Sequence, residues 1–278
     1  MLPTTLAVSL PEMANLDDHS ISGKVIVPAV EILDFLLRAI DQRGIQLGAP
    51  LTMRDVSFPR FLPADEIARC RFEVALEDTA SGVRTIFSSK IALANGIERQ
   101  RVHAVVTFGG TVAPPPEPPA ESESDYRVAA ERVYAELVRF GSRFRNLRGT
   151  VRLAQGAAWA EVESPTPPHQ NPSRAGCPYL LDSAMHLACV WGQRYAGMVA
   201  YPTGFIARTI FWPVAHGRRH CTVVPRAREP RRLTFDLWLT DDANHVCDAI
   251  AGLQMSHIAK SAPPPAWIAM ARSAEIAR

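Results

Sequence analysis

Two short segments of this 278-residue chain carry the side chains best suited to acid–base chemistry. His19 follows two aspartates in a loop that leads to a predicted helix beginning near Pro28, and Gly23 lies between them. A glycine permits a turn or a close approach of the backbone to a ligand. The unpaired N–H groups at a helix start can face a ligand oxygen. This arrangement suits a histidine base beside an oxyanion site.

The second segment is the apolar stretch LLDSAMHLACVW, residues 180–191, in which Asp182 is the lone carboxylate and His186 follows it by four residues. On a helix this spacing places both side chains on one face. Burial among apolar side chains raises the pKa of a carboxyl and favours its protonated form. We therefore expect Asp182 to be able to donate a proton. Taken singly, His19 is more simply explained as a solvated loop residue, and Asp182 is equally explained as a capping residue or one on an exposed helix edge.

Apolar periodicity predicts one long helix in each half of the chain, over residues 28–44 and 179–197. Alternating patterns predict strands around each helix. The predicted strands cover residues 69–78, 84–94, 101–109, 149–156, 157–164, 204–214, 221–227 and 233–241. The same plan, one helix among antiparallel strands, thus occurs twice without an exact sequence repeat.

A proline-rich and then acidic stretch, residues 112–125, has the composition of a linker. A second proline-rich run, SAPPPAW, covers residues 261–267. We expect an N-terminal unit at 1–112, a linker at 113–128, a C-terminal unit at 129–262 and a tail at 263–278. Within the tail, residues 268–278 are expected to form a short helix or a frayed end.

The overall composition is that of an ordinary globular protein, with 47% hydrophobic residues, 21% charged residues and a net charge of +2. This near-neutral balance argues against general nucleic-acid binding. Residues 143–232 nevertheless hold thirteen arginines, no lysine and four acidic residues, a local charge of +9. Such a surface suits an acidic protein partner or a phosphorylated ligand. Scattered, solvated arginines explain the same count.

No apolar run approaches the length of about 18 residues that a membrane-spanning helix needs, and the N-terminus lacks the basic start of a secretory signal. The five cysteines are far apart and form no CxxC pair. They predict reduced thiols in a cytoplasmic protein rather than disulfides. His216, His220 and Cys221 lie close in sequence, but no second cluster accompanies them, so we expect no metal site.

His19, Gly23 and Pro28 stand in HxxxGxxxxP spacing, and Asp182 and His186 in DxxxH spacing. Through these motifs the chain resembles the dehydratase domain of modular polyketide synthases. The resemblance implies an α+β double hotdog, two antiparallel sheets each wrapped around a long central helix. It extends over nearly the whole chain, through residues 16–37, 55–63, 99–109, 139–149, 178–186 and 201–211.

The resemblance implies the removal of water from a 3-hydroxyacyl thioester carried on the phosphopantetheine of an acyl carrier protein, giving a 2-enoyl thioester without metal or redox cofactor. His19 would take the α-proton, Asp182 would hold or protonate the departing hydroxyl, and His186 would orient Asp182. The expected oxyanion site is the backbone near Gly23, Val25 and Pro28. The expected substrate tunnel is lined by Phe140, Gly141, Phe144, Tyr201, Pro202 and Phe205.

The implied partners are other polyketide synthase components and a carrier protein that docks in trans, with a homodimer as a further possibility. Because such carriers are acidic, the arginine-rich half is the expected docking surface, at Arg218, Arg219, Arg231 and Arg232. Phe140 departs from the family pattern, which carries a tyrosine there. Two alternatives therefore stay open: a variant that shifts double bonds or closes rings, and a non-catalytic double hotdog that binds acyl chains.

Overall fold

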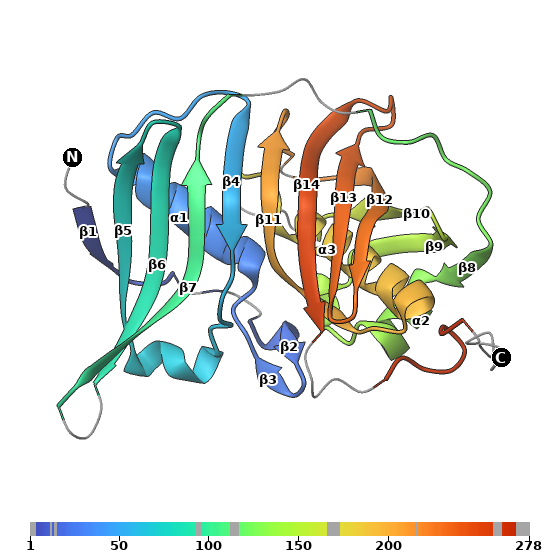
Figure 1. The fold of residues 1–278 in the computed structure, drawn as a ribbon, viewed down its shortest axis with the longest axis horizontal. Helices are drawn as coiled ribbons and strands as arrows, with labels where there is room; N and C mark the ends of the chain where they lie inside the picture. The colour runs from blue at the N-terminus through green and yellow to red at the C-terminus, as the bar shows by residue number, and fades with distance from the viewer. Residues whose placement is uncertain are drawn as a thin grey trace, which may run out of the picture.

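The computed structural model describes residues 4–11, 13, 16–92, 96–111, 117–165, 173–214, 216–257 and 263–270. Within these residues, twelve strands pair antiparallel in one continuous sheet, in the order β1-β5-β6-β7-β4-β11-β14-β13-β12-β10-β9-β8 (Figure 1). The strands of this sheet are β1 (Thr4–Val8), β4 (Leu51–Ser57), β5 (Arg71–Thr79), β6 (Gly82–Ala92), β7 (Glu98–Phe108), β8 (Tyr126–Ala129), β9 (Leu147–Ala154), β10 (Ala157–Glu163), β11 (Ala200–Ile210), β12 (Arg218–Glu229), β13 (Arg232–Thr240) and β14 (Val246–His257).

The first five strands in this order curve around the helix α1 (Ala29–Gln42), which crosses behind them in Figure 1. The helix begins directly after Pro28, whose fixed φ suits a helix start. Its apolar face, Val30, Leu33, Leu36, Leu37 and Ile40, is fully buried. A small hairpin of β2 (Ser20–Ile21) and β3 (Lys24–Val25) precedes the helix.

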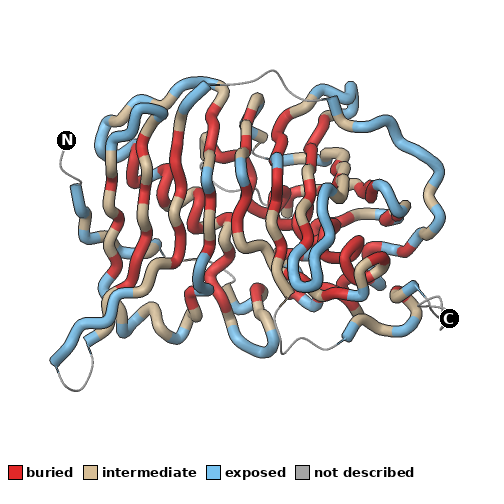
Figure 2. The backbone as a smooth tube through the Cα atoms, in the orientation of Figure 1, coloured by how far each residue is buried: buried red, intermediate tan, exposed pale blue. Residues whose placement is uncertain are grey.

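The other seven strands curve around the helix α3 (Pro178–Trp191), and all fourteen residues of this helix are buried (Figure 2). Its buried surface explains why the sequence is apolar nearly all round. A π-helical turn, Gly192–Ala196, extends α3, and the short helix α2 (Ala130–Arg132) continues into another, Val133–Leu137. Three 3₁₀ turns, Leu16–Asp18, Ala64–Arg69 and Ser142–Phe144, complete the helical segments of the described chain.

The two halves join where β4 pairs with β11. Gly204 of β11 lies at this seam with φ of +153°, and a Cβ there would stand 2.2 Å from the carbonyl oxygen of Val56. Only glycine permits so close an approach. The predicted double hotdog is confirmed, and its two sheets meet edge to edge as one. The seam brings α1 and α3 into contact, so side chains from both halves can share one cavity.

Four strands of the large sheet were not predicted from alternation: β1, β4, β8 and β14. The burial of β14 explains its omission, because consecutive residues from Cys247 to Ile250 are all buried and show no alternation. Residues 263–270 of the expected tail pack against the rest of the chain, since Ile268 is fully buried and Trp267 is hydrogen-bonded to Glu136. The rest of the tail lies outside the described residues. Strand β8 begins inside the expected linker. We retain the two-unit division of the chain as a proposal.

Candidate active site

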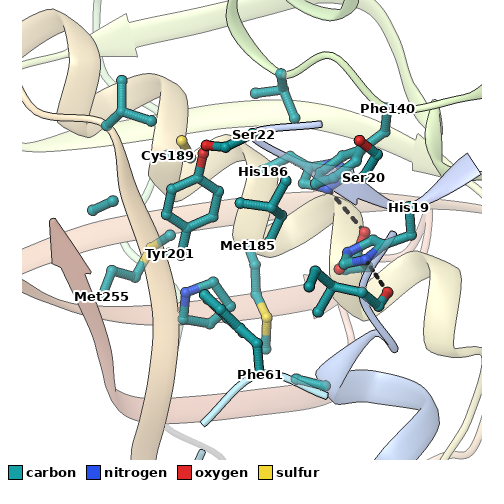
Figure 3. A pocket seen from close by; sticks show the side chains of 18 of the residues that line it. His19, Ser20, Ser22, Phe61, Phe140, Met185, His186, Cys189, Tyr201 and Met255 are labelled. Atoms are coloured by element: carbon teal, nitrogen blue, oxygen red, sulfur yellow. Dashed lines mark hydrogen bonds and ion pairs between the residues drawn. The ribbon is translucent and has the colours of Figure 1, made fainter. Parts of the chain in front are cut away.

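A cavity of about 300 Å³ lies between the two halves. The first half contributes the His19 loop, the start of α1 and the segment after β4, and the second half contributes α3, β11 and the segment before β9. In Figure 3, His19 and Phe140 stand on one side of the cavity, and Tyr201, Cys189 and Met255 stand on the other. His19, Asp182 and His186, which the motifs single out, therefore share one cavity.

The His19 side chain is held by the hairpin that follows it. Ser22 and Gly23 form the hairpin turn, with φ of +51° and +78°, as a tight turn between twisted strands requires. The turn brings Ile26 back to His19, so that the Ile26 amide donates to the His19 carbonyl at 3.0 Å. The Ile26 carbonyl in turn lies 2.8 Å from His19 Nδ1. Since a carbonyl only accepts, Nδ1 carries the proton and Nε2 has the lone pair of a base.

Electrostatics favour this neutral form of His19. The side chain is only 6% exposed. Burial lowers the pKa of His19 below its ordinary value, and the nearby Asp182 carboxylate and the Ile26 carbonyl only partly oppose this effect. The imidazole is therefore unprotonated near neutral pH.

Asp182 and His186 lie one helical turn apart on α3, with Oδ2 and Nε2 separated by 2.8 Å. Both side chains are buried. Burial acts to raise the pKa of Asp182, but the imidazoles of His186 and His19 outweigh it, and the pKa lies below its ordinary value. The expectation that burial keeps Asp182 protonated is therefore wrong. The pKa of Asp182 is lowered by two neighbouring imidazoles, and only one of them, that of His186, is near Asp182 in sequence.

Tyr134 is a site residue that the sequence motifs did not indicate. Its hydroxyl oxygen accepts the amide N–H groups of Asn146 and Leu147, each at 2.9 Å. With these bonds made, the hydroxyl proton is available to His186 Nδ1, which lies 3.4 Å away. Acceptance at Nδ1 leaves the His186 proton on Nε2, facing Asp182. Tyr134 thus supports the same ionised state of Asp182.

Phe140 connects the two histidines. Its ring stacks on His19 at 4.6 Å and 10° and on His186 at 4.9 Å and 30°. Phe144 lies 5.0 Å from His19. These aromatic rings cover a face of each imidazole and so contribute to the burial described above.

The expected tunnel residues divide into two groups. Phe140, Tyr201 and Pro202 line the cavity, whereas Gly141, Phe144 and Phe205 do not. Phe205 packs one layer behind, against the cavity residue Phe58 at 6.5 Å. Side chains alternate across a strand, so β11 cannot direct all of its residues to the same side.

The expected oxyanion residues Gly23, Val25 and Pro28 do not line the cavity either. Gly23 is exposed at the hairpin tip, where a side chain would meet open space. The amides of Ile26 and Val27 are bonded to the carbonyls of His19 and Leu62. The nearest helix start that reaches the cavity is Ala29, the first residue of α1.

The four arginines expected to bind a carrier do not form one patch. Arg218 and Arg219 begin β12, whereas Arg231 and Arg232 lie at the turn after it, and a twelve-residue strand separates the pairs by roughly 35 Å. Arg232 pairs with Ser256, next to the cavity residue Met255, so the second pair lies at the cavity end of the sheet. The two pairs are close in sequence, but because a single strand connects them they lie at opposite ends of β12.

Several further residues line the cavity, although the sequence analysis did not identify them as site residues. His103 is 1% exposed, and its Nε2 lies 2.7 Å from Ser89 Oγ. It stands in a predicted alternating strand, and alternation indicates which residues face the interior but not which of them reach the cavity. Arg60 and Arg139 are exposed lining residues that form no ion pair within the described part of the chain. Met185 and Cys189 continue the α3 face of Asp182, and this periodicity is the signal that could have identified them.

The described residues offer neither a metal-binding cluster nor a membrane-spanning helix. No group of three or more His, Cys, Asp or Glu side chains there is placed to hold a metal ion. No described helix is long and apolar enough to cross a membrane.

The family comparisons cover both halves of the chain. Residues 4–89 match the family described as polyketide synthase dehydratase domain, and residues 112–265 match the one described as polyketide synthase dehydratase N-terminal domain. The polyketide synthase GfsB of Streptomyces halstedii is 27% identical over an alignment of 212 residues that covers 70% of this chain. The chain matches only 4% of the length of GfsB.

The solved structures show the same fold at low sequence identity. An inactive His-to-Phe mutant of the CurJ dehydratase, in complex with a compound, has a TM-score of 0.74 and 18% identity over 92% of this chain and 91% of its own. The dehydratase domain of PpsC from Mycobacterium tuberculosis, in complex with C12:1-CoA, has a TM-score of 0.70 and 16% identity over 92% and 93% of the two chains.

Proposed function

This chain belongs to the polyketide synthase dehydratase family, and from that premise we propose that it removes water from a 3-hydroxyacyl thioester on an acyl carrier protein to give the 2-enoyl thioester. The observation that carries the proposal is the meeting of His19 from a first-half loop and Asp182 from a second-half helix in one cavity. The relatives agree with it: CurJ is inactive as a His-to-Phe mutant, and PpsC binds C12:1-CoA.

His19 is the base in this proposal. The C–H bond at the α-carbon breaks, its proton goes to His19 Nε2, and its electron pair forms the double bond as the β-carbon loses its hydroxyl. A neutral imidazole is needed for the first event, and the buried His19 is neutral. The Asp182 carboxylate stabilises the imidazolium that forms, because it lies close enough to raise the pKa of His19.

Asp182 holds the departing hydroxyl by accepting a hydrogen bond from it. Because Asp182 is ionised, the proton that leaves with the hydroxyl comes from the His19 imidazolium, which returns to neutral as water is formed. No oxidant, reductant or metal enters this balance, so we propose that the reaction uses no cofactor. We propose that the N-terminus of α1, at Ala29, stabilises the negative charge that develops on the thioester carbonyl oxygen, because helix N-termini favour negative charge.

The carrier protein docks, in this proposal, at the cavity end of the sheet. Exposed Arg60 and Arg139 line the cavity, and Arg231 and Arg232 lie at the same end. Reversing the charge of Arg231 and Arg232 should weaken carrier binding and flatten its salt dependence. The same change at Arg218 and Arg219 is the matched control at the far end of β12. An equal effect from both pairs would reject this placement.

The test of the reaction is incubation with a 3-hydroxyacyl pantetheine thioester while the absorbance of the conjugated enoyl product is followed. His19→Phe and Asp182→Asn should each lower the rate by at least about a hundredfold. His245→Phe is the control, because His245 also lies beside an aspartate but is exposed. Wild-type rates in both cavity variants would reject the assigned roles. Product analysis in the same assay separates dehydration from a double-bond shift or ring closure.

The pH profile separates the two possible proton sources. If Asp182 is ionised, kcat/KM should rise with increasing pH as His19 loses its proton, with a pKa below 6.5. At higher pH kcat/KM should then stay level. A fall on the alkaline side would mean instead that Asp182 delivers the proton.

A further inference from the structure

The turn Leu16–Asp18, directly before His19, binds the second half of the molecule. The Asp18 carbonyl accepts the amide of Gly141 at 2.7 Å. The Asp18 carboxylate accepts the amide of Arg143 at 2.9 Å and faces the hydroxyl of Ser142 at 3.3 Å. One residue of the first half thus binds three successive residues of the second.

Gly141 makes this approach possible. A Cβ at this position would lie 2.0 Å from Asp18 Oδ1, closer than any real contact. The φ of Gly141 is −72°, which other residues adopt freely. Glycine is therefore required here for space next to the carboxylate and not for its backbone conformation.

The bound segment is flanked by the two rings that contact His19. Phe140 precedes Gly141, and its ring stacks on the His19 imidazole at 4.6 Å. Phe144 ends the same turn, and its ring lies 5.0 Å from the His19 ring. The other side of His19 is held by the Ile26 carbonyl of its own hairpin. The imidazole is thus fixed between a first-half carbonyl and second-half rings, and Asp18 joins the two supports.

We propose that Asp18 is a positioning residue, whose carboxylate binds the 141–143 segment and so holds His19 against Phe140 with Nε2 free for substrate. The catalytic part of this inference rests on the proposed function. The positioning part does not, because it concerns the His19 ring alone. A misplacement of about 1 Å in such a group can cost about a hundredfold in rate.

The experiment compares Asp18→Ala, Asp18→Asn and Asp17→Ala in the full chain. Asp17 is exposed, so its replacement removes the same charge one residue away without touching the 141–143 segment. The His19 imidazole is titrated by NMR without substrate, with His19→Phe to assign its signal. Asp182 and His186 are the titratable groups that face this ring, and neither is altered.

Asp18→Ala should raise the pKa of His19 toward its ordinary value, since release of the aromatic segment admits water. It should also lower kcat about 30- to 100-fold with KM nearly unchanged. Asp18→Asn keeps an acceptor oxygen, so its His19 pKa and its kcat should both stay near the wild-type values. Asp17→Ala should match the wild type in both.

If Asp18→Ala does not fold, Gly141→Ala should give the same two changes, because its methyl group displaces the carboxylate. A folded variant with a wild-type His19 titration would overturn the proposal, and so would equal effects from Asp17→Ala. The NMR result decides positioning even if the wild-type chain does not dehydrate the thioester, so failure of the proposed function is recognised separately.

Discussion

The rings of Phe140 and His19 are stacked almost parallel, 4.6 Å apart at 10°, although 121 positions separate them in the chain. The same phenyl ring stacks on His186. Phe140 therefore contacts both the proposed base and the residue proposed to orient Asp182. An apolar ring at this position keeps water from both imidazoles and adds no charge between them.

Phe140→Leu should show what the two stacks contribute. Aromatic pairs add about 0.5–1.5 kcal/mol each beyond the area they bury, so we expect the free energy of unfolding to fall by about 1–3 kcal/mol. The pKa of His19 should rise as its burial decreases, and kcat should fall about tenfold. Thermal unfolding, NMR titration and the enoyl assay measure the three effects. Phe140→Tyr keeps the ring and both stacks, so an equal rise of the His19 pKa in that variant would contradict this account.

Tyr134→Phe should affect both stability and catalysis. Two buried amides, of Asn146 and Leu147, lose their acceptor, which costs about 1–3 kcal/mol each when no replacement is found. His186 Nδ1 also loses its nearest donor, so the Nε2 tautomer facing Asp182 is less favoured. We expect a lower melting temperature together with a lower kcat. NMR of the His186 ring nitrogens checks the tautomer directly, and an unchanged tautomer would limit Tyr134 to a structural role.

Much of the fold could be predicted because each half repeats a local pattern. The helices show 3.6-residue periodicity, and most strands alternate, so their types follow from short windows. Strand β14 breaks this rule, since burial on both faces removes the alternation. The joining of β4 to β11 depends on Gly204 admitting the Val56 carbonyl, and such an approach between distant segments leaves no local signal.

The candidate site divides in the same way. Asp182 and His186 were identified because one helical turn relates them, and His19 because its loop carries a recognisable spacing. Tyr134 and the Asp18–Gly141 contact were not identified, because they act across 52 and 123 positions. The protonation state of Asp182 could not be predicted for a related reason. The sequence indicates its burial, but the second imidazole beside it, His19, comes from the other half of the chain.

Glu31 makes the stability of the protein depend on pH. Burial, with Asp34 and Asp182 nearby, raises the pKa of this carboxyl from 4.5 to about 7. Between these values the native state binds more protons than the unfolded chain, so the free energy of unfolding falls as pH rises through this window. Glu31→Gln should therefore stabilise the protein by about 1–3 kcal/mol at pH 8 and by little at pH 4.

Denaturant unfolding at the two pH values measures this difference. Glu123→Gln is the control, because Glu123 is exposed and should give no pH-dependent gain. A gain from Glu31→Gln that is the same at both pH values would contradict the shifted pKa.

Trp267 holds one wall of the cavity in place. Its indole N–H donates to Glu136 Oε2 at 2.5 Å, and the guanidinium of Arg132 lies 3.8 Å over its ring. Pro263 and Pro265, just before it, line the cavity. Trp267→Ala should release this wall, which carries none of the proposed reacting groups. We expect KM to rise several-fold for short acyl chains and less for long or branched ones, with kcat nearly unchanged, because a wider cavity buries less of a small ligand.

Thioesters of increasing chain length, assayed with each variant, measure this selectivity. Trp267→Phe keeps a ring for Arg132 but loses the indole N–H, so it should give an intermediate result. Met270→Ala is the matched control, because the Met270 side chain is 51% exposed. A uniform change of KM at every chain length, or a loss confined to kcat, would mean that this segment supports the fold without shaping the cavity. A selective change would instead assign part of the substrate preference to a segment that the motifs of the family do not include.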